Sequence, residues 1–284
     1  MTTFTDPTHP HATDTVAAAN IPVVTSPTRI EPQSESDDRR VTILGVTITD
    51  VTQHWAVEII EQAIHRDPPK RCTIFFANAH TLNLAAADPS YRRTLATADH
   101  VFGDGTGVRW AARLQSVRVK DNLVGTDLMP ALFHTTAGRG YRYFLLGSDA
   151  STIDRAACYA AEQFPGWTQA GYHQGFLTTE ELNSQAIDQI NQSRADVLLV
   201  GMGNPLQERW IAAHRDRLDV PVCLGIGGLF DYWAENVSRA PAWIRRLGHE
   251  WAWRLYQQPR DKARRYLVGN PLFLARVFAE RFGS

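Results

Sequence analysis

The sequence predicts an α/β protein with a largely parallel, Rossmann-like sheet and a helical C-terminal appendage. Short apolar segments of strand length alternate with longer segments of helical periodicity, which is typical of βαβ units and a parallel sheet. Glycine-rich turns follow several of the apolar segments, at the place where ligands of such sheets bind. The composition, 44% hydrophobic and 21% charged, is ordinary for a globular protein and argues against a fibrous or wholly disordered chain.

The individual elements follow from local patterns. Residues 41–49 alternate apolar and polar side chains as a strand does, and apolar side chains recur at helical spacing over residues 52–66. Residues 72–77 read as a short buried strand, and Pro89 fits the first turn of a helix. The same reasoning predicts strands at 101–102, 141–146, 196–200 and 220–225, helices at 80–87, 88–98, 106–114, 126–138, 151–164, 179–193 and 205–217, and helices with breaks at Pro241, Pro259 and Pro271 beyond them.

Three regions are expected along the chain. Residues 1–40 are rich in Thr, Pro, Ser and Asp and lack the large apolar side chains needed to offset ordering entropy, so we expect a disordered tail. Residues 41–238 form the α/β core. Residues 239–284 form the appendage, which holds ten Lys and Arg against three Asp and Glu and so has a net charge of +7. Because the whole chain has a net charge of −1, residues 1–238 carry −8.

Several classes of protein are disfavoured. No run reaches the roughly 18 apolar residues of a spanning helix, and the N-terminus lacks the pattern of a signal peptide. The three cysteines, Cys72, Cys158 and Cys223, lie far apart, which indicates reduced thiols in the cytoplasm. No metal-binding motif is present, so we expect chemistry without a metal, and isolated histidines such as His80 and His173 read as structural.

Residues 102–107, Phe-Gly-Asp-Gly-Thr-Gly, place Asp104 between glycines directly after a predicted strand. Backbone of this kind can approach a ligand closely, so Asp104 is a candidate general base or ligand-binding acid. The alternative is that its side chain caps the helix that follows.

A second glycine turn, in residues 199–208, ends a strand and opens a helix whose free N–H groups suit a phosphate. It is not a complete dinucleotide fingerprint, because position 206 is Leu where the third glycine belongs. Residues 145–148 and 225–228 repeat the design, and Asp231 follows the latter. The three turns together predict a nucleotide or sugar-nucleotide crevice, and a plain strand-to-helix turn is the alternative for each.

The C-terminal region interleaves aromatic and basic residues. Trp243, Leu247, Trp251 and Leu255 recur at helical spacing beside arginines, as in an amphipathic helix on an anionic bilayer. Nucleic acid is the rival partner, but no nucleic-acid-binding motif accompanies the patch, so we expect none.

The motifs together resemble those of the WecG/TagA/CpsF glycosyltransferases, glycosyltransferase family 26, over about residues 41–270. They are Asn78–Ala85, Gly103–Gly107, Val124–Met129, Leu145–Ser148, Gly201–Glu208, Gly225–Asp231, Arg239–Pro241 and Glu250–Leu255, in this order. The resemblance implies an inverting, metal-independent enzyme without cofactors that moves a sugar from a UDP-sugar donor to a sugar on a polyprenyl diphosphate. It also implies a parallel α/β core and an appendage docked on the inner face of the cell membrane. The sequence leaves open whether the chain forms a homo-oligomer.

The resemblance assigns roles to individual residues. Asp104 becomes the general base, with Asn78 beside it in the pocket. The donor-side residues are Gly147, Ser148, Gly201, Gly203, Gln207, Gly228 and Asp231, and those on the acceptor and diphosphate side are Lys120, Asn122, Arg254, Arg260 and Arg264.

Two departures bear on the donor sugar. The chain has Phe76-Ala-Asn78 where many members have Thr-x-Asn, and Asn122 where many have Arg. Residues 120–122, Lys-Asp-Asn, resemble the exopolysaccharide branch of the xanthan and acetan type, which predicts a β-1,4-glucosyltransferase using UDP-glucose. The alternatives are an N-acetylmannosaminyl or N-acetylmannosaminuronyl transferase of the same family, a nucleotide-cofactor oxidoreductase, and a membrane- or nucleic-acid-binding module without catalysis.

Overall fold

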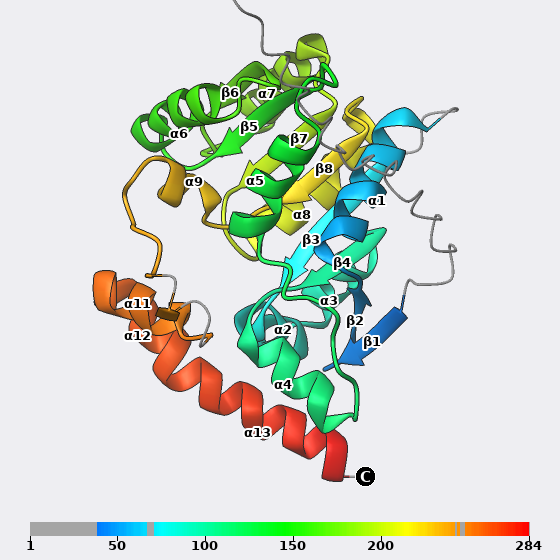
Figure 1. Cartoon of the computed structure of the whole chain (residues 1–284), viewed down its shortest axis with the longest axis vertical. Coiled ribbons are helices and arrows are strands. Elements are labelled where there is room, and N and C mark those ends of the chain that lie inside the picture. The colour runs from blue at the N-terminus through cyan, green and yellow to red at the C-terminus, as the bar shows by residue number, and fades with distance from the viewer. Residues whose placement is uncertain (1–38, 67–70, 242, 245–247, 284) are drawn as a thin grey trace, which may run out of the picture. The chain divides into compact units, whose positions relative to one another are not determined.

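A computed structural model describes residues 39–66, 71–241, 243–244 and 248–283, in which eight strands form one sheet (Figure 1). The strands lie in the order β1-β2-β4-β3-β8-β7-β5-β6, and every neighbouring pair is parallel except β1 and β2. The predicted α/β fold with a largely parallel sheet is thus confirmed. The strands are β1 (Arg39–Ile43), β2 (Val46–Asp50), β3 (Cys72–Ala77), β4 (His100–Gly103), β5 (Arg142–Gly147), β6 (Thr168–His173), β7 (Val197–Gly201) and β8 (Val222–Gly225).

Helices cover both faces of the sheet, because alternate side chains of each buried strand enter different cores. In β3, Ile74 and Phe76 belong to one core, and Phe75 and Ala77 belong to the other. The first core is closed by α1 (Gln53–His65), α5 (Gly125–Thr135), α6 (Ala150–Gln163) and α9 (Leu229–Trp233). The second is closed by α2 (Ala79–Ala87), α3 (Pro89–Ala96), α4 (Thr106–Leu114), α7 (Glu180–Ser193), α8 (Leu206–His214) and α13 (Gly269–Phe282).

Two strand predictions need correction. Residues 41–49 are not one strand but the hairpin of β1 and β2, because Leu44 and Gly45 both take positive φ angles (49° and 75°) and reverse the chain in two residues. The alternation of apolar side chains continues on both arms and hides the turn. Strand β6 was not predicted, because it lies at the sheet edge, where its side chains are partly or fully exposed and lack an apolar pattern.

The C-terminal helices are α11 (Glu250–Gln257), α12 (Pro259–Ala263), a π-helical turn (Arg264–Val268) and α13. Pro259 separates α11 from α12 as predicted. Pro271, by contrast, does not interrupt a helix. It lies in the first turn of α13, where a missing N–H costs no hydrogen bond.

Helix α13 contacts α2 and α4, and Figure 1 shows it beside them. Its Phe273 and Val277, each 1% exposed, belong to the second core. No helix among the described residues is long and apolar enough to cross a membrane. The tail predicted for residues 1–40 lies outside the described residues, except for Arg39 and Arg40 in β1.

Candidate active site

Asn78 and Asp104 meet at the carboxyl edge of the sheet. Strands β3 and β4 are parallel neighbours with Ala77 opposite Gly103, so the residues that follow them lie side by side. Asn78 Nδ2 donates a hydrogen bond of 3.4 Å to Asp104 Oδ2, and the Asp104 N–H donates to the Ala77 carbonyl. Asn78 Oδ1 also caps α2 by accepting from two backbone N–H groups, which fixes the orientation of its amide.

The Asp104 carboxylate does not cap a helix. The residue at the N-cap of α4 is Gly105, whose φ of +92° favours glycine, and no side chain accepts a hydrogen bond from this end of the helix. Burial raises the pKa of Asp104 to about 6, against the opposing effects of the Asn78 hydrogen bond and the Arg265 charge. The carboxylate can therefore accept a proton close to neutral pH.

A cleft of about 1190 Å³ opens along this edge, between the ends of the strands and the C-terminal helices. Five of the predicted donor-side residues line it: Ser148, Gly201, Gly203, Gly228 and Asp231. The opposite wall carries five cationic side chains: Arg254, Lys262, Arg264, Arg265 and Arg276. The cleft is thus suited to ligands that bring several negative charges.

Gln207 and Gly147 are placed differently from the other donor-side residues. The side chain of Gln207, a residue only 1% exposed, accepts hydrogen bonds at Oε1 from the N–H groups of Gly203 (3.1 Å) and Gly227 (3.0 Å). It therefore ties together the turns that follow β7 and β8. Gly147 does not line the cleft, and a Cβ there would lie 2.3 Å from the Gly201 carbonyl oxygen. The close approach of β5 and β7 explains this glycine.

Glu208 completes the support of these turns. Its Oε1 accepts hydrogen bonds from Gln207 Nε2 (2.8 Å) and Asn204 Nδ2 (2.6 Å). The residue is fully buried, and burial raises the pKa of its carboxyl to about 7. Glu208 thus orients the Gln207 amide beneath the cleft. The sequence offered a signal, two polar residues in the first turn of a buried helix, but did not indicate what they contact.

Arg254 presents its guanidinium to the cleft from α11. Its side chain is 15% exposed and lies over the Tyr232 ring, 4.7 Å from the centroid, with Nη2 at 3.9 Å from Asp231 Oδ2. Arg254 Nε and Nη2 are buried and have no hydrogen-bond partner among the described residues. Unsatisfied buried donors of a cation indicate a place for an anion.

Arg265 and His80 also line the cleft but were not predicted as site residues. Arg265 Nη2 donates to Asn78 Oδ1 at 3.3 Å and so places a cation beside the Asn78–Asp104 pair. Burial, with the nearby charges of Arg265 and Lys262, lowers the pKa of His80 to about 4, which keeps the imidazole neutral at pH 7. The sequence pattern could not show that Arg265, and not only its neighbour Arg264, belongs to the site.

Of the acceptor-side predictions, Arg254 and Arg264 line the cleft, whereas Lys120, Asn122 and Arg260 do not. The Lys120 N–H donates to Asp50 Oδ1 at the carboxyl end of β2, outside the cleft lining. Asn122 Oδ1 accepts from the Gly105 N–H and so contacts the Asp104 loop instead of the cleft. Arg260 is exposed on α12. Within the described part of the chain, no three His, Cys, Asp or Glu side chains gather as metal ligands would.

The comparison with known families agrees with this geometry. The sequence profile of the Glycosyl transferase WecG/TagA/CpsF family matches residues 41–284. The chain belongs to this family. It is therefore a glycosyltransferase. Its candidate active site is the cleft together with the neighbouring Asn78–Asp104 pair, neither of which lines the cleft itself.

Several curated relatives of this WecG/TagA/CpsF glycosyltransferase are named N-acetylglucosaminyldiphosphoundecaprenol N-acetyl-beta-D-mannosaminyltransferase. The one from Staphylococcus aureus strain MW2 is 26% identical over 86% of this chain and 94% of its own length. Those from strains NCTC 8325 and MRSA252 are 28% and 29% identical, each over 78% of this chain and 86% of the relative. A lipid-linked diphosphate sugar is thus the acceptor named for these relatives.

Proposed function

We propose that this glycosyltransferase moves a sugar from a UDP-sugar to the hydroxyl of a sugar on a polyprenyl diphosphate, with inversion and without a metal. The main support is Asp104, a carboxylate with its pKa raised to about 6, which does not line the cleft but bonds to Asn78, whose Oδ1 accepts from Arg265 of the cationic wall. The cleft offers charge for a diphosphate, and Asp104 offers a base that is linked to the cleft through Asn78 and Arg265.

Each step of the transfer has a residue to perform it. Asp104 takes the proton of the acceptor hydroxyl as its oxygen bonds to the anomeric carbon of the donor. The bond from that carbon to the UDP oxygen breaks, and the electron pair leaves with the diphosphate. Arg254 and Arg265 stabilise the negative charge that develops on the leaving group. Asn78 holds the carboxylate in place through its hydrogen bond to Oδ2.

For the donor sugar we propose N-acetylmannosamine, and for the acceptor sugar lipid-linked N-acetylglucosamine, because the relatives are named for this pair. This choice favours the alternative over the predicted glucose. The glucose prediction depended on residues 120–122, and neither Lys120 nor Asn122 lines the cleft. The exopolysaccharide branch has no support among these relatives.

The oxidoreductase alternative is weakened by the turn after β7. A dinucleotide pyrophosphate needs free N–H groups at such a turn. Here the Gly203 N–H already donates to Gln207 Oε1, as does that of Gly227.

We further propose that the C-terminal helices bind an anionic membrane surface, where a polyprenyl acceptor resides. Exposed apolar and aromatic side chains extend from α11 to α13, and exposed arginines lie among them. This combination is typical of helices that lie at a bilayer interface. The apolar residues are Trp251, Tyr256, Leu267, Val268, Leu272, Phe278 and Phe282.

A transfer assay tests the proposed function. Purified protein is incubated with UDP-N-acetylmannosamine or UDP-glucose as the donor. The acceptor is a synthetic polyprenyl diphosphate that carries N-acetylglucosamine or glucose, and the products are identified by mass spectrometry. We expect a disaccharide product from the first donor with the first acceptor. Product from UDP-glucose alone would restore the glucose prediction, and no product from any pair would contradict the proposal.

A further inference from the structure

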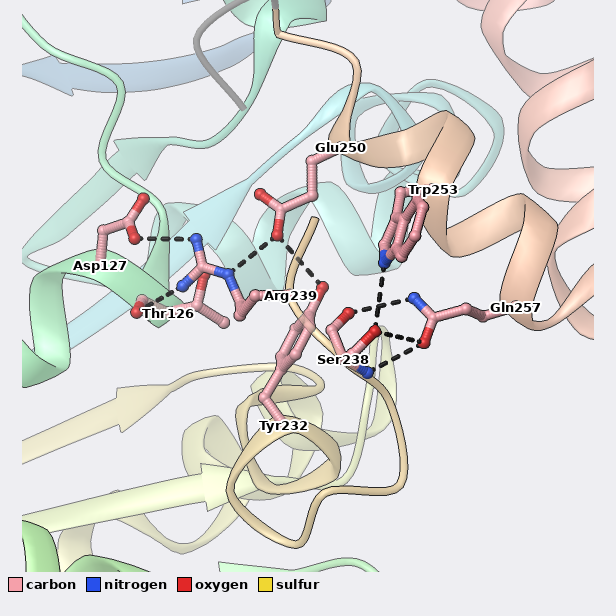
Figure 2. A network of polar contacts seen from close by, with 8 residues as sticks. All are labelled: Thr126, Asp127, Tyr232, Ser238, Arg239, Glu250, Trp253 and Gln257. Carbon is pink, nitrogen blue, oxygen red and sulfur yellow. Dashed lines mark hydrogen bonds and ion pairs between the residues drawn. The ribbon is translucent and has the colours of Figure 1, made fainter. Parts of the chain in front are cut away.

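Arg239 joins three separate parts of the chain (Figure 2). Its Nη1 donates to the Thr126 carbonyl (3.0 Å) and its Nη2 to Asp127 Oδ1 (2.8 Å), both in α5. Its Nε donates to Glu250 Oε1 (2.9 Å) in the first turn of α11. One guanidinium in the loop after α9 therefore ties a C-terminal helix to the sheet-covering helix α5.

Glu250 and Arg254 both contact Tyr232. These two residues are four apart in α11, so they lie on one face of the helix. The hydroxyl of Tyr232 donates to Glu250 Oε1 at 3.5 Å, and the Arg254 guanidinium covers the Tyr232 ring. The Arg239 guanidinium lies 5.5 Å from the same ring centroid. Both guanidinium groups thus lie close to the Tyr232 ring.

The burial of Arg239 suits a structural connection more than ligand binding. Its side chain is 26% exposed, and it does not line the cleft. Each of its three guanidinium nitrogens already donates within the protein. Bidentate and forked contacts of this kind fix geometry more strictly than a lysine can. Ser238 adds to the attachment, since its N–H and hydroxyl donate to Gln257 Oε1 at the end of α11.

We propose that Arg239 is a positioning residue: through Glu250 and Tyr232 it sets the orientation of α11 and aims Arg254 at the diphosphate of the substrate. This rests on the proposed function for the identity of the substrate. The affinity of the cleft for a diphosphate then depends on Arg239, which lies outside the cleft and acts through Arg254.

The test is a double-mutant cycle on ligand binding. We compare the wild-type protein, Arg239→Ala, Arg254→Ala and the double variant, and measure the dissociation constants of UDP and of inorganic pyrophosphate by calorimetry. Loss of Arg254 removes a charged contact and should weaken binding about tenfold or more. Arg239→Ala should weaken it about fivefold, and the double variant should bind no worse than Arg254→Ala alone, because coupled residues are not additive.

Two additions separate positioning from general stability. Hydrogen exchange should speed up over residues 250–257 in Arg239→Ala and stay unchanged over residues 206–214. Arg239→Lys should recover only part of the affinity, since lysine cannot reach three acceptors at once. The matched control is Arg217→Ala, which removes an exposed arginine bonded to Glu180 and Ser184 of α7, and should change neither affinity nor exchange at α11.

The outcomes distinguish this inference from the proposed function. Multiplicative losses in the double variant, or a lower melting temperature with unchanged affinities, would overturn the positioning role. Pyrophosphate binding with the expected coupling, but no binding of UDP, would support the role of Arg239 and contradict the UDP donor. Failure of the wild-type protein to bind either ligand would overturn both.

Discussion

The side-chain oxygen of Asn122 accepts a hydrogen bond of 2.6 Å from the backbone N–H of Gly105. Asp104 is the preceding residue, and the Leu123 N–H donates to the Gly103 carbonyl on its other side. The segment around Asn122 therefore holds the glycine loop of the candidate base from both ends. Asn122 was predicted to bind the acceptor, and the contact that the structure gives it is with the loop of the candidate base.

Replacing Asn122 should lower turnover more than substrate affinity. Asn122→Ala removes an acceptor worth about 1 kcal/mol, so kcat should fall about fivefold. Asn122→Asp keeps an oxygen that can accept from the Gly105 N–H and should recover most of the rate. Steady-state kinetics give kcat and KM separately. A rise in the acceptor KM at constant kcat, for both variants, would return Asn122 to its predicted binding role.

Asp104→Asn should abolish most of the activity. The amide keeps the size of the side chain but cannot take the acceptor proton, and general-base catalysis is worth about 10²–10⁴ in rate. UDP affinity should stay near the wild-type value. The base must be ionised to act, so kcat/KM of the wild-type protein should rise with pH through about 6 and level off above it. Normal turnover of the variant would place the base elsewhere.

The same substitution should have a stability effect that depends on pH. The pKa of the Asp104 carboxyl is raised from its ordinary 3.8 to about 6 by burial, so the ionised group destabilises the folded protein above pH 6 and this cost is absent below about pH 4. Asp104→Asn should therefore melt at or above the wild-type temperature at pH 8, and the two should converge near pH 4. Unfolding of the variant at both pH values would indicate a structural role.

Gln207→Met should loosen the two glycine turns. Methionine keeps the length of the side chain but leaves the N–H groups of Gly203 and Gly227 without their acceptor, at about 1–3 kcal/mol for such a loss. The melting temperature should drop by several degrees, at about 2–4 °C per kcal/mol, and UDP should bind more weakly. Gln163→Ala, at the exposed end of α6, is the control. Weaker UDP binding with an unchanged melting temperature would indicate direct contact with the donor.

Much of the fold could be predicted because buried parallel strands have strong local signatures. β7 is apolar throughout and ends in glycine, and Pro259 fits the first turn of a helix, where its missing N–H costs no hydrogen bond. Two features were not predicted, the hairpin of β1 and β2 and the edge strand β6. Both depend on contacts with neighbours in space more than on a local sequence pattern. A two-residue turn at Leu44 interrupts no pattern, and an edge strand needs no apolar face.

The site was predictable only in part, for a related reason. Asp104 and the glycine turns stand at strand ends, so their common location follows from the topology of a parallel sheet. Gln207 was predicted to lie on the donor side, but the inward direction of its side chain depends on Glu208 and on two backbone N–H groups. Arg265 reaches Asn78 across 187 residues of sequence, a contact that no spacing indicates.

Membrane binding should depend on exposed apolar residues of the C-terminal helices. Leu267→Ser with Phe278→Ser removes two such side chains outside the cleft, each worth about 1.5–3 kcal/mol when fully buried in an apolar phase. Sedimentation with anionic vesicles should show at least tenfold weaker binding, and salt should weaken the wild-type binding by screening the arginines. Leu182→Ser, at an exposed leucine of α7, is the control. Equal loss in the control, or binding indifferent to salt, would contradict docking by this surface.

Transfer should continue in the presence of EDTA. The cationic side chains that line the cleft can neutralise a diphosphate without Mg²⁺ or Mn²⁺. The measurement is the initial rate before and after chelation and after adding back each metal. Activity lost on chelation and restored by a metal would show that the arginines are not sufficient.

Helix α13 comes after the other elements of the described fold along the chain, yet its Phe273 and Val277 lie in the core beside α2 and α4. A nascent chain therefore lacks part of the packing of this core until α13 has been synthesised. Arg276 and Leu272, which line the cleft, arrive with the same helix. A premature stop codon shortly before α13 would thus yield a polypeptide with an uncovered apolar face, and not a smaller enzyme.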